Sequence, residues 1–137
     1  MSDEKDAISE AADIAVQQFQ TLDFSEKSME EVESILNVGS EMFKEMPEKV
    51  QQEKIEVLGS YILEVARRMF GGELAWHEGY KQPLLVVQTE NSRVALMTWK
   101  KVKGRLSGDL ADNIPYFFNG FVIAVRADEP GQDILCL

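Results

Sequence analysis

One stretch of the sequence, residues 53–88, restricts the fold of this chain more than any other. Five apolar residues in its first half are spaced three or four apart, which places them on one side of a helix. These are Ile55, Leu58, Ile62, Val65 and Met69. Gly71 and Gly72 follow Phe70 and favour the end of the helix there, because glycine adopts positive φ without a steric penalty. Beyond them the apolar period shortens toward two, so the stretch predicts a long core helix that passes into a sheet.

Gly59 lies inside this predicted helix, where glycine costs about 1 kcal/mol relative to alanine. We interpret Gly59 as a point of close approach by another helix or by the sheet. The alternative is a backbone left bare for a ligand.

Two further helices are predicted before this one. The first runs from Glu4 to about Gln20, with an apolar stripe at Ile8, Ala12, Ala15, Phe19 and Leu22. The second begins after Ser25, a good N-cap, with Phe24 expected to pack on Met29. Its stripe is Met29, Val32, Ile35 or Leu36, Met42 or Phe43, and Met46, with a possible break at Gly39 and Ser40. Pro47 either ends this helix or opens the third.

Three short strands are predicted after Gly72, at residues 73–77, 84–89 and 93–98, and the turn-like segments between them favour an antiparallel meander. Thr98 is expected to cap a short helix, and Asp112 or Asn113 a last one. Residues 117–125 are predicted as helix, with a strand as the alternative. The fold class is therefore α+β: three N-terminal helices, a three-stranded antiparallel meander and two short C-terminal helices. Residues 1–126 form the single domain, and residues 127–137 a C-terminal tail that is either loose or docked.

Part of the chain resembles a pattern found in small bacterial domains of unknown function. The resemblance rests on the run from Leu58 to Val65, on Phe70-Gly71-Gly72 and Trp76, and on the run from Thr98 to Leu106. It covers about residues 55–121. It implies an α+β fold, a bacterial source and no established activity, and some such small acidic proteins resemble immunity proteins encoded beside toxins.

The charge of the chain is segregated between its two halves. The net charge is −10; residues 1–64 hold 16 Asp and Glu against 5 Lys, and residues 65–137 hold 8 against 9 Lys and Arg. An acidic helical half disfavours nucleic acid and membrane surfaces and favours a basic partner. The acidic N-terminus and the lack of about 18 consecutive apolar residues predict a cytoplasmic protein.

The residues needed for common catalytic and metal sites are scarce. His77 is the only histidine and Cys136 the only cysteine, so zinc sites based on either residue type are excluded. The sequence shows no calcium loop and no nucleophile elbow. We therefore expect no metal, no cofactor and no enzymatic activity.

Carboxylates in the second predicted helix and just beyond it are the best candidate binding residues. They are Glu26, Glu30, Glu31, Glu33, Glu41 and Glu45, and two pairs of them repel each other at a spacing of four residues. A helix that carries such repulsion is expected to use it, so we predict an immunity or antitoxin-like protein that binds a basic protein partner. The alternative is a small-molecule-binding or enzymatic domain with a pocket lined by Tyr61, Trp76, His77 and Trp99. A homodimer built on the helical half is a third possibility.

Overall fold

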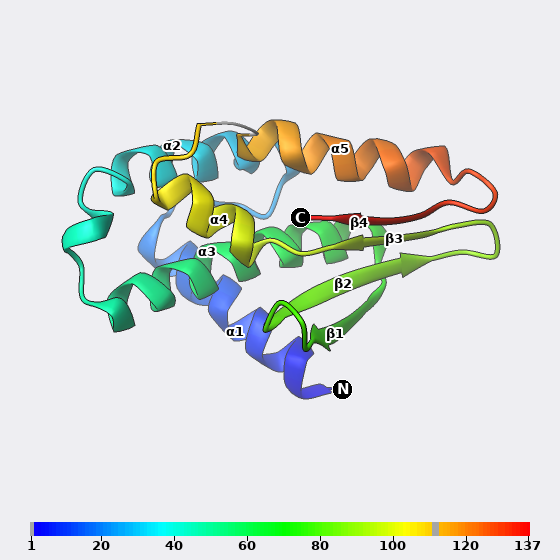
Figure 1. The fold of residues 1–137 in the computed structure, drawn as a ribbon, viewed down its shortest axis with the longest axis horizontal. Coiled ribbons are helices and arrows are strands. Elements are labelled where there is room, and N and C mark those ends of the chain that lie inside the picture. Colours follow the sequence, from blue (N-terminus) through cyan, green and yellow to red (C-terminus); the bar gives the residue numbers. More distant parts are fainter. Residues whose placement is uncertain (1, 111–112) are drawn as a thin grey trace.

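The computed structural model describes residues 2–110 and 113–137, and the possible cap Asp112 lies outside them. The chain folds as α+β, with three helices before the sheet in the sequence and two more between its third and fourth strands (Figure 1). The helices are α1 (Ser2–Gln18), α2 (Met29–Gly39), α3 (Glu48–Phe70), α4 (Trp99–Leu106) and α5 (Ile114–Ala127), with short 3-10 helices η1 (Glu26–Ser28) and η2 (Phe43–Glu45). The strands are β1 (Glu73–His77), β2 (Gln82–Gln88), β3 (Arg93–Leu96) and β4 (Asp133–Cys136).

The sheet has four strands in the order β1-β2-β3-β4, and this corrects the predicted three-stranded antiparallel meander. The first two pairings are antiparallel as expected, but β4 lies parallel to β3. The N–H groups of Arg93 and Met97 donate to the carbonyl oxygens of Gln132 and Cys136, each at 2.8 Å. The end of the chain is therefore docked. The connection from β3 to β4 runs through α4 and α5, which allows the two strands to point the same way.

Helix α3 is the centre of the hydrophobic core, as its apolar stripe predicted. Ile55, Leu58, Ile62 and Val65 are buried, and Met69 is half-buried against the same core. The helix ends at Phe70, where the Gly71 N–H donates to the Arg67 carbonyl at 2.7 Å. Gly71 has φ 73° and ψ −147°, so its φ is positive as the glycine predicted, although its ψ lies outside the left-handed helical region.

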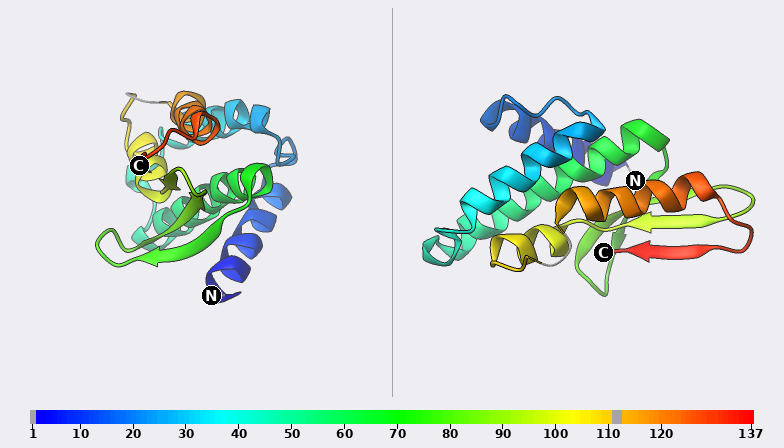
Figure 2. Two further views of the ribbon diagram at one scale, coloured as in Figure 1. Left: turned by 90° about the vertical axis from the view of Figure 1, so that its right-hand side faces the viewer. Right: turned by 90° about the horizontal axis from the view of Figure 1, so that it is seen from above.

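Helix α1 packs on α3, and α2 packs on α5 and α4, through buried residues that include Ile8, Ala12, Met29 and Val32, as their spacing predicted (Figure 2). The structure resolves two open alternatives, because Leu36 and Phe43 are buried while Met42 is 63% exposed. Phe24, which we expected to pack on Met29, packs against the core cluster that includes Met29, and its ring centre lies 5.2 Å from that of Tyr61. Phe24 has φ 66°, and this conformation turns the chain between α1 and η1.

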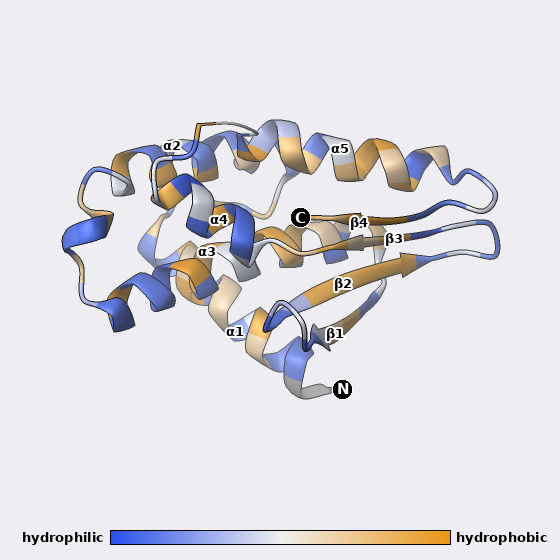
Figure 3. Ribbon diagram, in the orientation of Figure 1, coloured by the Kyte–Doolittle hydropathy of each residue, from blue (hydrophilic) through white to orange (hydrophobic). Residues whose placement is uncertain are grey.

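Helix α4 starts differently from the prediction. The Thr98 hydroxyl does not cap it but donates to the Gly59 carbonyl oxygen at 2.6 Å, and the Trp99 N–H donates to Gln82 Oε1 at 3.0 Å. A Cβ at Gly59 would lie 2.4 Å from Trp99 Cδ1, which confirms the interpretation of Gly59 as a point of close approach. Apolar residues line the side of α3 that faces the sheet and α4 (Figure 3).

Helix α5 confirms the helical prediction for residues 117–125. The Asn113 side chain caps it by accepting the Tyr116 N–H at 2.9 Å, and Pro115 lies in its first turn, where a missing N–H costs nothing. Phe117, Phe118 and Phe121 face the core.

Candidate functional site

The predicted acidic residues do not form one surface. Glu26 lies in η1 and Glu30 and Glu31 in the first turn of α2, whereas Glu41 and Glu45 lie beyond its other end. All five are exposed. Because a helix of 11 residues spans about 16 Å, these carboxylates make two separate groups.

Glu33, the sixth predicted residue, is used inside the fold. Its carboxylate pairs with the guanidinium of Arg105, whose side chain is 4% exposed, and it accepts the Ile114 N–H at 2.9 Å. Burial alone would raise the pKa of Glu33, but the hydrogen bonds from Arg105 and Ile114 and the charge of Arg105 outweigh it and lower the pKa below its ordinary value. Glu33 therefore joins α2 to α4 and α5.

The four predicted pocket residues do not share a cavity. Tyr61 is fully buried, and its hydroxyl accepts the Phe24 N–H at 2.8 Å and lies 2.7 Å from Ser28 Oγ. Trp76 and Trp99 do meet, edge to face, with ring centroids 6.1 Å apart. His77 lies nearby in β1, and its Nδ1 accepts the Tyr80 N–H at 3.1 Å. The structure thus separates Tyr61 from the other three aromatic residues.

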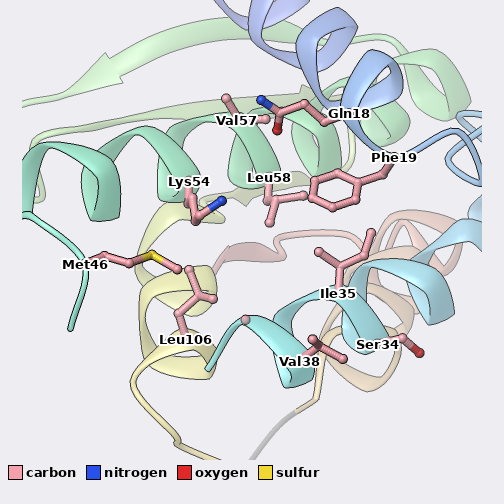
Figure 4. Close-up of a pocket in the computed structure, with 11 residues that line it drawn as sticks. Gln18, Phe19, Ser34, Ile35, Val38, Met46, Lys54, Val57, Leu58 and Leu106 are labelled. Atoms are coloured by element: carbon pink, nitrogen blue, oxygen red, sulfur yellow. The ribbon is translucent and has the colours of Figure 1, made fainter. Parts of the chain in front are cut away.

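An apolar hollow of about 390 Å³, which was not predicted from the sequence, lies between α2 and α3 (Figure 4). Its walls are Gln18, Phe19, Ser34, Ile35, Val38, Gly39, Met46, Lys54, Val57, Leu58 and Leu106. Val38 at its edge is 68% exposed. Apolar side chains from α2, α3 and α4 and from the two loops that hold Phe19 and Met46 therefore surround the opening, and contact of water with this apolar surface is unfavourable.

A second hollow of about 500 Å³ continues the first along α3, because Gln18, Lys54 and Val57 line both. Its remaining walls are Ala7, Glu10, Ala11, Ile14, Val50, Glu53 and Glu56. We call the two hollows together the α3 groove. One end of this groove is apolar, and the other carries the carboxylates of Glu10, Glu53 and Glu56 against the single ammonium of Lys54. A chain segment with apolar residues at one end and basic residues at the other would match this arrangement.

Sequence reasoning missed the α3 groove, although a signal for it exists. Ala7, Ala11 and Ile14 form a second stripe on α1 beside the buried residues Ile8 and Ala12. A helix with one buried stripe and one neighbouring exposed apolar stripe leaves room at its side for a further element.

The described residues offer little for catalysis. Among them, no group of three or more His, Cys, Asp and Glu side chains could hold a metal ion. Burial raises the pKa of the Cys136 thiol, which disfavours the thiolate that acts as a nucleophile. None of the described helices combines the length and the hydropathy needed to cross a membrane.

Comparison with known proteins adds no further constraint. No protein-family model, no curated protein and no solved structure matches the chain. The resemblance to small bacterial domains therefore stays a prediction, and the geometry of the α3 groove is the strongest guide to function.

Proposed function

We propose that this protein is a binding module whose α3 groove holds a basic amphipathic segment of a protein partner. The observation that carries the proposal is the continuity of the groove, which joins an apolar hollow to one that contains Glu10, Glu53 and Glu56. Burial of apolar surface would supply affinity, and the carboxylates would select the sign of the partner's charge.

The shape of the groove suits a helix better than an isolated side chain. It runs along α3 between α1 and α2, and helices that dock in such grooves do so through apolar residues at helical spacing. The exposed residues Glu30 and Glu31 lie one helical turn before Ser34 and Ile35, so α2 carries a second negative group near the apolar hollow.

The partner that this charge distribution favours is a basic protein. In its most concrete form, the module is an immunity or antitoxin-like protein that blocks a basic enzyme by shape and charge. The alternative of an enzymatic pocket at Tyr61, Trp76, His77 and Trp99 has weaker support, since Tyr61 is enclosed in the core.

The test uses a fluorescent synthetic amphipathic helix of leucine and lysine as the probe and anisotropy as the readout. We expect binding to the full chain that weakens about tenfold in Val38→Asp, which places a charge at the apolar edge, and in Glu53→Gln/Glu56→Gln. Binding should also weaken as salt rises from about 50 to about 300 mM.

Matched controls distinguish binding in the groove from attraction by the overall negative charge of the protein. Glu78→Gln/Glu129→Gln removes the same two charges from exposed turns and should leave the affinity unchanged. An equal loss of affinity in the groove variants and in this control would refute the proposal that the groove is the binding site. A leucine and glutamate helix that binds as tightly as the lysine helix would refute the role of charge.

A further inference from the structure

A smaller cavity of about 240 Å³ lies away from the α3 groove, where four segments of the chain meet. Gln52 and Ile55 come from α3, Tyr80 and Lys81 from the turn after β1, Gln82 from the start of β2, and Trp99, Lys100 and Lys103 from α4. Three lysines and two aromatic rings thus converge in a protein whose net charge is −10.

Lys100 lies in the first turn of α4, where the helix alone does not favour a positive charge. The N-terminus of a helix carries partial positive charge and favours acidic side chains, yet α4 has no acidic residue in its first turn. Among the described residues, no carboxylate lies within ion-pair distance of Lys100 or Lys103, and Lys81 pairs only with the exposed Glu78. Lys100 Nζ lies instead 5.4 Å from the centre of the Tyr80 ring. An anion in the cavity would relieve this concentration of positive charge.

Gln82 provides a second and independent indication. It is 4% exposed, and its Oε1 accepts the Trp99 N–H, which fixes the orientation of the side-chain amide because only the oxygen can accept. Its Nε2 has no hydrogen-bond partner in residues 2–110 or 113–137, although Gln82 lines the cavity. Among the described residues, no enclosed polar side-chain atom lacks a partner, so this Nε2 is open to the cavity and can donate to a ligand oxygen there.

The aromatic wall is held rigidly. Trp99 Nε1 donates to Ser60 Oγ at 3.4 Å, the Trp99 ring packs against Trp76, and its edge fills the space left by Gly59. Trp99 therefore offers a fixed apolar surface beside the lysines, and Tyr80 contributes a second ring to the lining of the cavity. Such a surface suits a planar ring.

From this geometry we propose that the cavity binds a small aromatic phosphate. The ring lies against Trp99 and Tyr80, and the phosphate lies among Lys81, Lys100 and Lys103 and accepts a hydrogen bond from Gln82 Nε2. The volume accommodates one ring with one anionic group. A doubly charged phosphate neutralises more of the charge of three ammonium groups than a single carboxylate does.

The test follows the fluorescence of Trp99 in a Trp76→Phe background, so that a single tryptophan reports. The probe is phenyl phosphate, with phenol and inorganic phosphate as its two halves. We expect a saturable change with phenyl phosphate and binding of each half that is weaker by at least about tenfold.

Three variants assign the residues in the same background. Lys100→Gln/Lys103→Gln should weaken the binding of phenyl phosphate at least about tenfold. Lys44→Gln/Lys49→Gln removes two exposed charges elsewhere and should leave that affinity unchanged. Gln82→Glu keeps an oxygen for the Trp99 N–H but replaces the donor with a negative charge, and it should abolish binding. Circular dichroism verifies that each variant is folded.

Several results would overturn the proposal. These are the absence of saturable binding, equal affinity before and after the Lys100→Gln/Lys103→Gln change, equal affinity in Gln82→Glu, and binding of phenol or inorganic phosphate as tight as that of phenyl phosphate. None of these results bears on the α3 groove, which is tested with a separate probe.

Discussion

At the scale of single residues, the ion pair between Glu33 and Arg105 is the polar contact whose loss we expect to lower the free energy of unfolding most. Removing one partner from a buried pair leaves a charge without compensation, which costs about 3–5 kcal/mol. Arg105→Ala should therefore lower the free energy of unfolding by about 3 kcal/mol, as measured by urea denaturation. Lys103→Ala, an exposed change on the same helix, should alter it by less than about 0.5 kcal/mol. A similar effect of both changes would mean that the pair contributes little.

Tyr61 presents a second test at the residue scale. Its buried hydroxyl accepts the Phe24 N–H and contacts Ser28, so Tyr61→Phe leaves a backbone donor and a hydroxyl without that partner. We expect a loss of about 1–3 kcal/mol in the free energy of unfolding. Tyr116→Phe removes a hydroxyl at an exposed position of α5 and serves as the control, with no change expected in the melting temperature.

At the scale of elements, two glycines inside helices should respond in opposite ways to the same substitution. Gly59 in α3 faces Trp99 so closely that an added Cβ must displace the ring, whereas a Cβ added to Gly120 in α5 would meet no described atom within 4 Å beyond its chain neighbours and its own helix backbone. Gly120→Ala should stabilise the protein by about 0.5–1 kcal/mol through helix propensity alone. Gly59→Ala should destabilise it by about 1–3 kcal/mol, because crowding in the core exceeds that gain.

Thermal unfolding of the two glycine variants measures both effects. A stabilised Gly59→Ala protein would show that Trp99 moves aside without penalty. Displacement of Trp99 in Gly59→Ala should also weaken the binding of phenyl phosphate, which links the Gly59–Trp99 contact to the proposed cavity.

At the scale of the whole molecule, the buried carboxylates set the response to acid. Burial of Glu64 would raise its pKa, but hydrogen bonds from Arg67 and Arg68 and their charges outweigh burial and lower the pKa, as for Glu33. A pKa that is lower in the folded than in the unfolded chain means that the stabilisation is complete above the ordinary value of 4.5 and is lost as pH falls through the folded value.

The free energy of unfolding should therefore be nearly constant from about pH 7 to about pH 5 and fall steadily below about pH 4.5. Urea titrations at a series of pH values measure this profile. In Glu33→Gln the fall should be shallower, since one of the titrating groups is gone. An unchanged slope would mean that Glu33 has the same pKa in the folded and unfolded chain.

The sequence by itself determined the local architecture, because helical and strand periods act over a few residues. The apolar stripe of α3, its end before Gly71, the three strands after it and the helical state of α5 all follow from neighbouring residues. The acidic character of the first half was also visible from composition.

Only the tertiary structure decided which distant residues meet. Glu33 finds Arg105 across 72 positions, and the four residues of β4 carry too weak a pattern to show that they pair with β3. The α3 groove and the cavity proposed to bind an aromatic phosphate likewise depend on how four or more segments of the chain pack together. Contacts of this kind carry no local periodicity, because their free energy comes from surfaces that are brought together only when the whole chain folds.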